Sequence, residues 1–292
     1  MSRAAGQDDR FAYANRQVYE SGVVEVLQSG RRAYLDAGEE AALLRVADRV
    51  RSKCVLDIGV GGGRTVGLLR LLTADYRGID FSRRLVGLAR RRYPDADVSW
   101  GDARDLSRFA DGVFDMVMFS WNGIDTLDRK GRLLALAEIA RVLKTDGVFV
   151  FSTLNLYGMS FGETPFQLHR PGRPVELKPE VVAQLLWRNL TDPGRFGRRV
   201  KNWRASKRRA QLGDGWATAA LSALDFQLLN HFTSLPVLLS DLRGAGLEPE
   251  VVFEIGPQGT AQVVPQGTPC PRSDLFHVVA VRSALPASAA GP

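Results

Sequence analysis

The residues best suited to ligand chemistry lie between Asp57 and Thr65, where a short apolar run ends in glycines. Gly59, Gly61 and Gly63 alternate with other residues there. Glycine has no Cβ, so the chain can turn with positive φ and approach a ligand closely. A helix that begins directly after such a turn offers unpaired backbone N–H groups to an anionic group such as a carboxylate. With the carboxylate of Asp57 beside it, this arrangement suits a zwitterionic amino-acid group.

The spacing of these glycines does not fit two common nucleotide-binding patterns. A G-x-G-x-x-G pattern starting at Gly59 would need glycine where Arg64 stands, and one starting at Gly61 would need glycine where Val66 stands. The phosphate-binding pattern G-x-x-x-x-G-K-[ST] also fails, because no Gly-Lys pair follows the turn. The sequence itself therefore disfavours a dinucleotide-binding dehydrogenase.

Two further acidic residues end the next apolar runs of the chain. Asp80 closes the segment 76–80, 21 residues after Gly59, where a carboxylate can accept hydrogen bonds from ribose hydroxyls. Asp102 closes the segment 97–102. Helix capping is the alternative role for Asp80, and a solvated loop position is the alternative for Asp102. Three acids at successive strand ends, beside one glycine turn, favour a shared ligand site.

Short apolar runs alternate with amphipathic segments from residue 38 to residue 155, which predicts strands alternating with helices. Strands this apolar are buried on both faces, so they indicate a mostly parallel sheet with helices on each side. The predicted strands span 54–58, 76–80, 97–102, 114–120 and 147–155, and the predicted helices span 38–50, 64–72, 83–93 and 130–143.

The pattern changes after Asn155. In 156–230 we predict no strand and two helices, near 179–190 and 216–229. Alternation returns with a helix near 235–245, followed by two strands that pair antiparallel, 248–255 and 275–283, and a Gly- and Pro-rich loop between them. The chain then divides into an N-terminal segment and candidate active-site cover (1–37), an α/β core (38–155), a helical, basic insertion that covers the substrate (156–230), the C-terminal part of the core (231–283) and a disordered tail (284–292).

The run D-I-G-V-G-G-G at 57–63 resembles the first motif of class I S-adenosylmethionine-dependent methyltransferases. A second similarity lies at 141–147, which reads R-V-L-K-T-D-G where the family commonly has R-V-L-K-P-G-G. The Thr-Asp departure keeps turn chemistry, because Asp-Gly also forms turns. The resemblance covers 38–155 well and 231–283 more loosely.

This resemblance implies a doubly wound, mostly parallel, seven-stranded sheet of Rossmann-like type and S-adenosylmethionine as the cofactor. The glycine turn would hold the methionine part, with Asp57 near its amino group. Asp102 would lie at the adenine amino group, with the backbone of Ala103 nearby. The residues assigned to cofactor binding are Asp57, Gly59, Gly61, Gly63, Asp80, Phe81, Asp102, Ala103 and Ser120.

Methyl transfer needs an acceptor atom in line with the sulfonium methyl and a site that excludes water. A general base is needed only if the acceptor begins protonated. The candidates are Asn122 just beyond the fourth strand, His169 in the insertion and His231 before the last helix; a plain turn or loop position is the alternative for each. His277 is expected to pack within a strand. No cluster of His, Cys or carboxylates has metal-ligand spacing, so we expect no metal.

The chain has 39 basic and 32 acidic residues, a net charge of +7, and the segment 195–209 contains no acidic residue. This segment could capture a phosphate, a carboxylate, an acidic carrier protein or a membrane surface; the alternative is a solvated helix. No apolar run is long enough to cross a bilayer, and the first residues lack the apolar centre of a signal peptide. We therefore expect a cytoplasmic protein.

These features favour a methyltransferase acting on an oxygen or nitrogen atom of a small molecule, including an anionic acceptor of specialised metabolism. A second hypothesis makes RNA or DNA the acceptor, with Trp203 as a stacking group among the basic residues. It is less favoured, because no RNA-binding module is recognisable. A third hypothesis is a non-catalytic regulatory protein that still binds the cofactor. Salt-sensitive RNA binding would favour the second, and cofactor binding without methyl transfer would favour the third.

Overall fold

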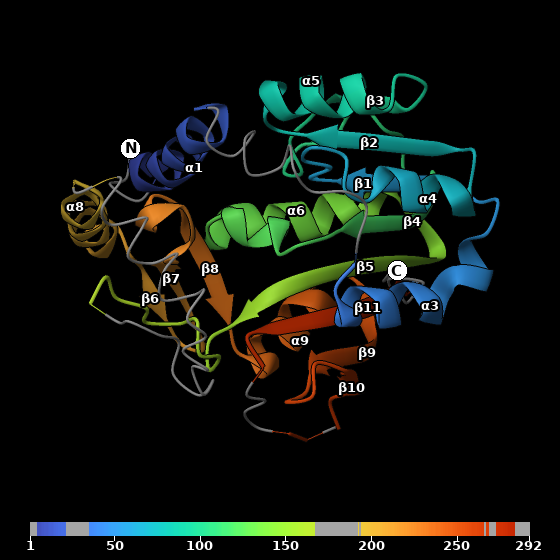
Figure 1. Ribbon diagram of the computed structural model, residues 1–292. Helices are drawn as coiled ribbons and strands as arrows, with labels where there is room; N and C mark the ends of the chain where they lie inside the picture. The colour runs from blue at the N-terminus through green and yellow to red at the C-terminus, as the bar shows by residue number, and fades with distance from the viewer. Residues whose placement is uncertain are drawn as a thin grey trace, which may run out of the picture.

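The computed structural model describes residues 5–21, 35–166, 192, 194–265, 267–268 and 273–283. Its centre is an 11-stranded sheet with helices on both faces (Figure 1). The first five strands are β1 (Val55–Ile58), β2 (Tyr76–Asp80), β3 (Asp97–Trp100), β4 (Phe114–Phe119) and β5 (Leu143–Asn155). The later strands are β6 (Leu212–Gly213), β7 (Trp216–Ala220), β8 (Leu229–Thr233), β9 (Leu247–Ile255), β10 (Ala261–Val263) and β11 (Leu275–Arg282).

The main path of the sheet has the strand order β10-β9-β11-β5-β4-β1-β2-β3. β1 pairs parallel with both β2 and β4, and all four of its residues are buried, because helices cover both faces. β11 lies antiparallel between β5 and β9. The predicted fold class is therefore confirmed. Strand order reverses between β1 and β4, which opens a crevice at the carboxyl ends of these strands.

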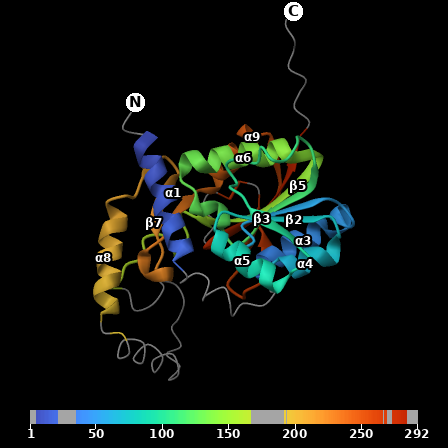
Figure 2. The ribbon, with the colours of Figure 1, turned by 90° about the horizontal axis from the view of Figure 1, so that it is seen from above.

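Helices form a layer on each side of the sheet. Figure 2 shows α3, α4 and α5 on one side, and α6 and α9 on the other. Each layer buries its own apolar cluster, with Val46 and Leu69 in the first and Leu136 and Leu238 in the second. The helices are α1 (Ala5–Glu20), α3 (Ala37–Val50), α4 (Val66–Leu72), α5 (Arg83–Arg92), α6 (Arg129–Val142), α8 (Arg195–Lys207) and α9 (Leu235–Gly244), with the short 3-10 helices η1 (Gly123–Thr126) and η2 (Ala223–Phe226).

One predicted helix is wrong. The segment 216–229 forms strand β7, the short η2 and the first residue of β8 instead of a helix. Its alanines favour a helix locally, but Trp216 to Ala220 pair with the buried strand β8, and this tertiary pairing overrides the propensity. The strand β10 also lies in a segment predicted to be a loop. The helix predicted near 179–190 falls outside the described residues.

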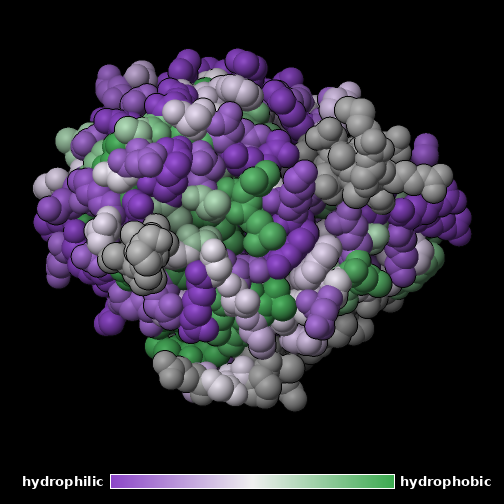
Figure 3. All heavy atoms as spheres, turned by 180° about the vertical axis from the view of Figure 1, so that it is seen from behind, coloured by the Kyte–Doolittle hydropathy of each residue, from purple (hydrophilic) through white to green (hydrophobic). Residues whose placement is uncertain are grey.

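The strands β6, β7 and β8 extend the sheet beyond the crevice. β8 pairs parallel with Leu154 and Asn155, at the end of β5 and past the last residue that β4 contacts. α8 and α1 lie side by side next to these strands (Figures 1 and 2). Seen from behind, hydrophilic side chains gather at the edge of the molecule where α8 lies (Figure 3). Among the helices that the structure describes, none combines the length and the apolar character needed to cross a bilayer.

Candidate functional site

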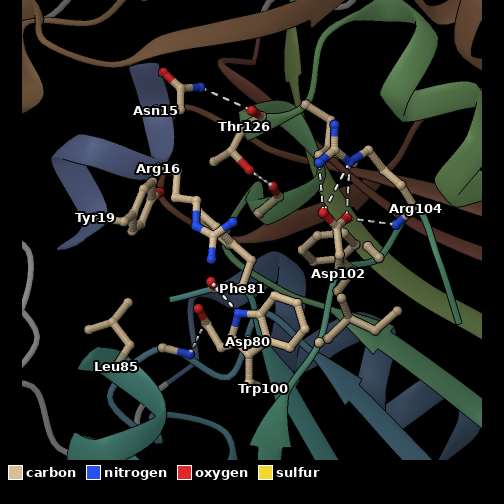
Figure 4. Close-up of a pocket in the computed structure, with 18 of the residues that line it drawn as sticks. Asn15, Arg16, Tyr19, Asp80, Phe81, Leu85, Trp100, Asp102, Arg104 and Thr126 are labelled. Carbon is tan, nitrogen blue, oxygen red and sulfur yellow. Dashed lines mark hydrogen bonds and ion pairs between the residues drawn. The ribbon is translucent and has the colours of Figure 1, made fainter. Parts of the chain in front are cut away.

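A cavity of about 370 Å³ lies at the carboxyl ends of β1, β2, β3 and β4. The crevice that the topology opens is therefore a real space, and it is bounded by residues from the strand ends and from α1 (Figure 4). Most of the residues predicted to bind the cofactor line it, namely Gly59, Gly61, Asp80, Phe81, Asp102, Ala103 and Ser120. Asp57 and Gly63 are not in its lining.

The glycine turn has the backbone conformation that its sequence predicts. Gly59, Gly61 and Gly63 have φ values of +69°, +54° and +90°. A Cβ on Gly59 would lie 2.9 Å from the ring of Phe119, and one on Gly63 would lie 2.8 Å from the ring of Tyr93. Gly59 and Gly61 line the cavity, and the glycine at 59 lets the backbone pass close to the ring of Phe119, which lines it too. The third allows α5 to pack closely behind the turn.

Asp80 is the acidic residue that the structure positions most firmly at the cavity. It is buried, with 4% of its surface exposed. One carboxylate oxygen accepts a hydrogen bond from the backbone N–H of Gly61 at 2.8 Å, and the other accepts one from Ser82 at 2.8 Å. Burial raises the pKa of Asp80 to about 6, and the two backbone donors oppose that rise. Because Ser82 provides the side-chain cap of α5, Asp80 is left to face the cavity.

Asp57 lies beneath the glycine turn. Its Oδ2 accepts hydrogen bonds from the hydroxyls of Thr65 at 2.6 Å and Tyr76 at 3.0 Å. Its Oδ1 has no hydrogen-bond partner among the described residues. Burial raises the pKa of Asp57 to about 6. The side chain therefore connects β1 to β2 and to the start of α4 by hydrogen bonds, and its Oδ1 atom can still accept another hydrogen bond.

Asp102 reaches the cavity from the end of β3, with Arg104 attached to it. Arg104 donates from its backbone N–H at 2.9 Å and forms a two-pronged ion pair whose shortest bond is 2.7 Å. Burial raises the pKa of Asp102, but the hydrogen bonds from Arg104 outweigh it and hold the pKa below its usual value. The neighbouring Trp100 donates from its indole N–H to the carbonyl of Phe81 at 2.9 Å, which fixes its ring at the cavity rim (Figure 4).

The N-terminal helix α1 supplies one wall of the cavity through Tyr13, Asn15, Arg16 and Tyr19. Asn15 ties this helix to the rest of the molecule, since its side-chain amide donates to the carbonyls of Leu229 at 2.8 Å and Thr126 at 3.0 Å. Sequence analysis missed Asn15 and Arg16, because a polar helix gives no sign of which face points inward.

The aromatic side chains of α1 carried a weak signal in the sequence. The ring of Tyr19 packs edge-on against Phe81 with centroids 4.9 Å apart. Burial raises the pKa of Tyr19 far above its usual range, so its hydroxyl stays protonated. Phe11 is buried as well, in a cluster with Phe226 and Leu229. Apolar contacts thus hold α1 at two places, at Tyr19 and at Phe11.

The loop after β4 forms another part of the wall. Ser120, Trp121 and Gly123 line the cavity, while Asn122 is not in the lining. Trp121 and Asn122 have φ values of +53° and +47°, which are uncommon for residues with a side chain. The loop is held by backbone hydrogen bonds, from Trp121 to Glu39 at 3.0 Å and from Asn122 to the hydroxyl of Ser152 at 2.7 Å. Backbone strain of this kind is typical of ligand sites.

The remaining candidates lie elsewhere. His231 was expected in a connection at the substrate, but it stands in β8, fully buried and outside the cavity lining. Burial, together with the charges of Arg132 and Arg129, lowers its pKa well below the usual value, so the ring is neutral. This placement corrects the expectation and does not support a catalytic role. His277 packs in β11, as predicted. His169 falls outside the described residues.

Comparisons with known proteins agree with this geometry. Residues 55–147 match the model of a methyltransferase domain family. A probable S-adenosylmethionine-dependent methyltransferase of Mycolicibacterium smegmatis is 29% identical over 153 residues, 52% of this chain and 54% of that protein. The demethylmenaquinone methyltransferase of Renibacterium salmoninarum is 36% identical over 96 residues, 33% of this chain and 39% of that protein. The chain spans about half the length, or less, of these curated relatives.

Solved structures share the architecture at low sequence identity. The 1,6-didemethyltoxoflavin-N1-methyltransferase of Burkholderia thailandensis, solved with 1,6-didemethyltoxoflavin and S-adenosylhomocysteine bound, is 15% identical. The match covers 95% of this chain and 91% of that one with a TM-score of 0.55. An S-adenosylmethionine-dependent methyltransferase of Mesorhizobium loti is 17% identical, with a TM-score of 0.52 over 84% of this chain and all of that one.

The strand order, the glycine turn after β1 and the acids after β2 and β3 define a Rossmann-like domain of the methyltransferase class. Residues 55–147, from β1 into β5, carry the match to the methyltransferase domain family, and the curated relatives that the chain resembles are S-adenosylmethionine-dependent methyltransferases.

Proposed function

We propose that this protein is a cytoplasmic enzyme that transfers the methyl group of S-adenosylmethionine to an oxygen or nitrogen atom of a small molecule. One observation carries the proposal. The buried carboxylate of Asp80 is presented to a cavity by two backbone N–H groups, one of which belongs to the glycine turn itself. A nucleoside that carries an amino-acid group has complementary groups for both features, because its ribose offers hydroxyl donors and its methionine end offers a carboxylate.

The residues at the cavity fit each part of that cofactor. Gly59 and Gly61 line the cavity and have positive φ, so the backbone of the turn can approach the methionine part closely. The free Oδ1 of Asp57, below the same turn, is an acceptor suited to an amino group. Asp80 accepts from the ribose hydroxyls. Asp102, with the buried Ala103 beside it, faces the place for the adenine amino group.

When bound, the cofactor supplies the reactive methyl, so the protein must mainly orient the acceptor and exclude water. The parts of the lining suited to this task are α1 and the strained loop at Trp121. We therefore assign α1 as a cover of the active site. Among the described lining residues there is no histidine, cysteine or lysine. The carboxylates in the lining, Asp80 and Asp102, are assigned to the cofactor, so we infer an acceptor atom that is nucleophilic without a side-chain base.

The charges at the cavity support an acceptor with an anionic group. Arg16 lines the cavity, is exposed, and forms no ion pair within the described part of the chain. It lies 5.8 Å from the ring of Trp100, and its charge helps to lower the pKa of Asp102. Arg104 lies nearby, already paired with Asp102. A carboxylate or phenolate on the acceptor would pair with Arg16 at the rim. The similarity to the demethylmenaquinone methyltransferase of Renibacterium salmoninarum is a second support for a small-molecule acceptor.

Titration calorimetry with S-adenosylmethionine and S-adenosylhomocysteine tests the cofactor site. We expect both ligands to bind and to raise the melting temperature. Asp80→Ala should weaken binding by about 10- to 100-fold, because it removes charge-assisted hydrogen bonds. Asp95→Ala is the matched control, since Asp95 is an exposed acid after α5 and outside the cavity lining. Absence of binding by the wild-type protein would overturn the proposal.

Radiolabelled cofactor tests the acceptor class. The protein is incubated with the small-molecule fraction of a cell extract and, separately, with its RNA. We expect label to enter the small-molecule fraction and to be absent with Asp80→Ala. Label in RNA alone would contradict the small-molecule assignment, and cofactor binding with no transfer to either fraction would favour a regulatory protein.

A further inference from the structure

The segment from Arg195 to Arg209 carries the whole positive excess of this chain. Eight of the 39 basic residues and none of the 32 acidic residues fall within it. The rest of the chain therefore holds 31 basic and 32 acidic residues, which is a balanced surface. Most of the segment forms α8, at one edge of the molecule (Figure 2). The net positive charge is therefore a property of this one segment and not of the whole surface.

The inner face of α8 makes the contacts that hold this helix against the rest of the protein. Arg195 and Arg199 both pair with Asp225, at 2.7 Å and 3.0 Å. The amide of Asn202 donates to the carbonyl of Asp225 at 3.0 Å. Trp203 packs on the cluster that includes Phe226. These contacts fix both the position of the helix and the direction in which its other face points.

The outer face of α8 is a shallow groove that is lined by basic and apolar side chains. Its lining consists of Phe196, Gly197, Val200, Lys201, Arg204, Ala205 and Arg208. Lys201, Arg204 and Arg208 are exposed, and none of their side chains forms a hydrogen bond or ion pair with another described residue. The ring of Phe196 is 50% exposed. The unpaired cations thus lie beside apolar side chains, and the uncharged polar residues of the helix, Asn202 and Ser206, point inward.

We propose that this outer face of α8 docks onto the surface of an anionic lipid membrane. A helix that places exposed apolar side chains between cations lies in the plane of a bilayer surface, with the cations at the phosphates and the apolar groups below them. Nucleic acid is the weaker partner for this face, because recognition of sugars and bases uses polar uncharged side chains as well as cations. The outer face between Phe196 and Arg208 has none.

The docking face is joined to the wall of the cavity. Trp203 of α8 and Phe11 of α1 belong to the same apolar cluster, and α1 lines the cavity. α1 and α8 lie side by side in both ribbon views (Figures 1 and 2). Docking would therefore bring the cavity close to the membrane surface, where an acceptor that joins an anionic group to an apolar part resides. This consequence rests on the proposed function, whereas the membrane contact itself does not.

Vesicle sedimentation tests the membrane contact. The full chain is mixed with phosphatidylcholine vesicles, with and without phosphatidylglycerol. We expect binding only to the anionic vesicles. The triple variant Lys201→Gln, Arg204→Gln, Arg208→Gln should bind about one hundredfold more weakly, since each basic side chain near an anionic surface contributes roughly fivefold. Phe196→Ala should lose the part of the binding that persists at high salt.

A matched variant separates this face from net charge. Lys53, Arg70 and Lys130 are exposed cations of the α/β core, so their triple substitution by Gln removes the same charge elsewhere. We expect it to bind vesicles like the wild-type protein. A triple that exchanges Lys and Arg at 201, 204 and 208 should also bind and controls for folding. Equal losses in the two Gln triples, no binding to anionic vesicles, or binding to single-stranded RNA or polyglutamate in place of vesicles would each overturn the proposal.

Discussion

The two walls of the cavity are built in different ways. The wall formed by the α/β core takes its residues from the ends of neighbouring strands, so Gly59, Asp80 and Asp102 meet because parallel strands end at one edge. The wall formed by α1 is held by contacts across the whole chain, such as that between Asn15 and Leu229. The core wall is therefore specified by local sequence, and the cover by distant pairings. We expect the same difference in the free energy of unfolding and in the affinity for the cofactor.

The largest effect is expected at a buried ion pair next to Thr126, whose carbonyl accepts a hydrogen bond from Asn15 of α1. Arg132 and Asp125 form this pair at 2.7 Å, and Asp125 also accepts from the backbone N–H of Leu154, where β5 pairs with β8. Arg132→Met leaves a buried carboxylate without its partner. We expect it to lower the free energy of unfolding by about 3–5 kcal/mol, as measured by urea denaturation.

A double variant checks the cause of that loss. Asp125→Asn combined with Arg132→Met removes both charges, so it should cost clearly less than the sum of the single changes. Additive losses would mean that packing volume matters there and charge pairing does not. A transition that splits into two steps in Arg132→Met would show that the cover unfolds separately from the core, which would strengthen the distinction between the walls.

The sequence predicted the core wall because its signals are local. Alternating glycines and a terminal acid such as Asp80 appear within a few residues of a strand end. It could not show that Asp57 lies below the turn, because that depends on Thr65 and Tyr76. Nor could it place the cover. The segment 216–229 is alanine-rich and locally helical, and only pairing with β8 makes part of it a strand. That pairing also buries His231, which had been expected at the substrate.

An intermediate effect is expected from pH at the core wall. The pKa of Asp80 is raised to about 6 by burial, and its ionised form is the better acceptor for ribose hydroxyls. Affinity for S-adenosylhomocysteine should therefore fall as pH drops through about 6, approaching tenfold per pH unit well below it. Calorimetry across this range measures the effect. Asp80→Asn should bind weakly and with a shallower pH profile, because only Asp57 then titrates in this range. A wild-type profile that is equally shallow would contradict the assignment.

Protonation of these carboxyl groups has the opposite effect on the stability of the ligand-free folded protein. A carboxyl whose pKa is raised on folding contributes stability that is fully present below its unfolded value of 3.8 and is lost as pH rises through about 6. Asp57 and Asp80 both act in this direction. Between these two pH values, ligand-free protein loses this contribution while ligand binding strengthens. The stabilisation by ligand, measured as the shift in melting temperature, should therefore increase with pH even if the melting temperature of the free protein does not.

The smallest effect is expected at the cover. Tyr19 contacts the core wall through its edge-on packing against Phe81, and such a contact contributes about 0.5–1.5 kcal/mol. Tyr19→Ala should therefore weaken S-adenosylhomocysteine binding by roughly three- to tenfold, less than Asp80→Ala, mainly through faster dissociation. Tyr157→Ala is the control, because Tyr157 is 52% exposed and outside the cavity lining. If Tyr19→Ala weakened binding as much as Asp80→Ala, the cover would hold the cofactor as firmly as the strand ends do, and the two walls could no longer be assigned separate roles.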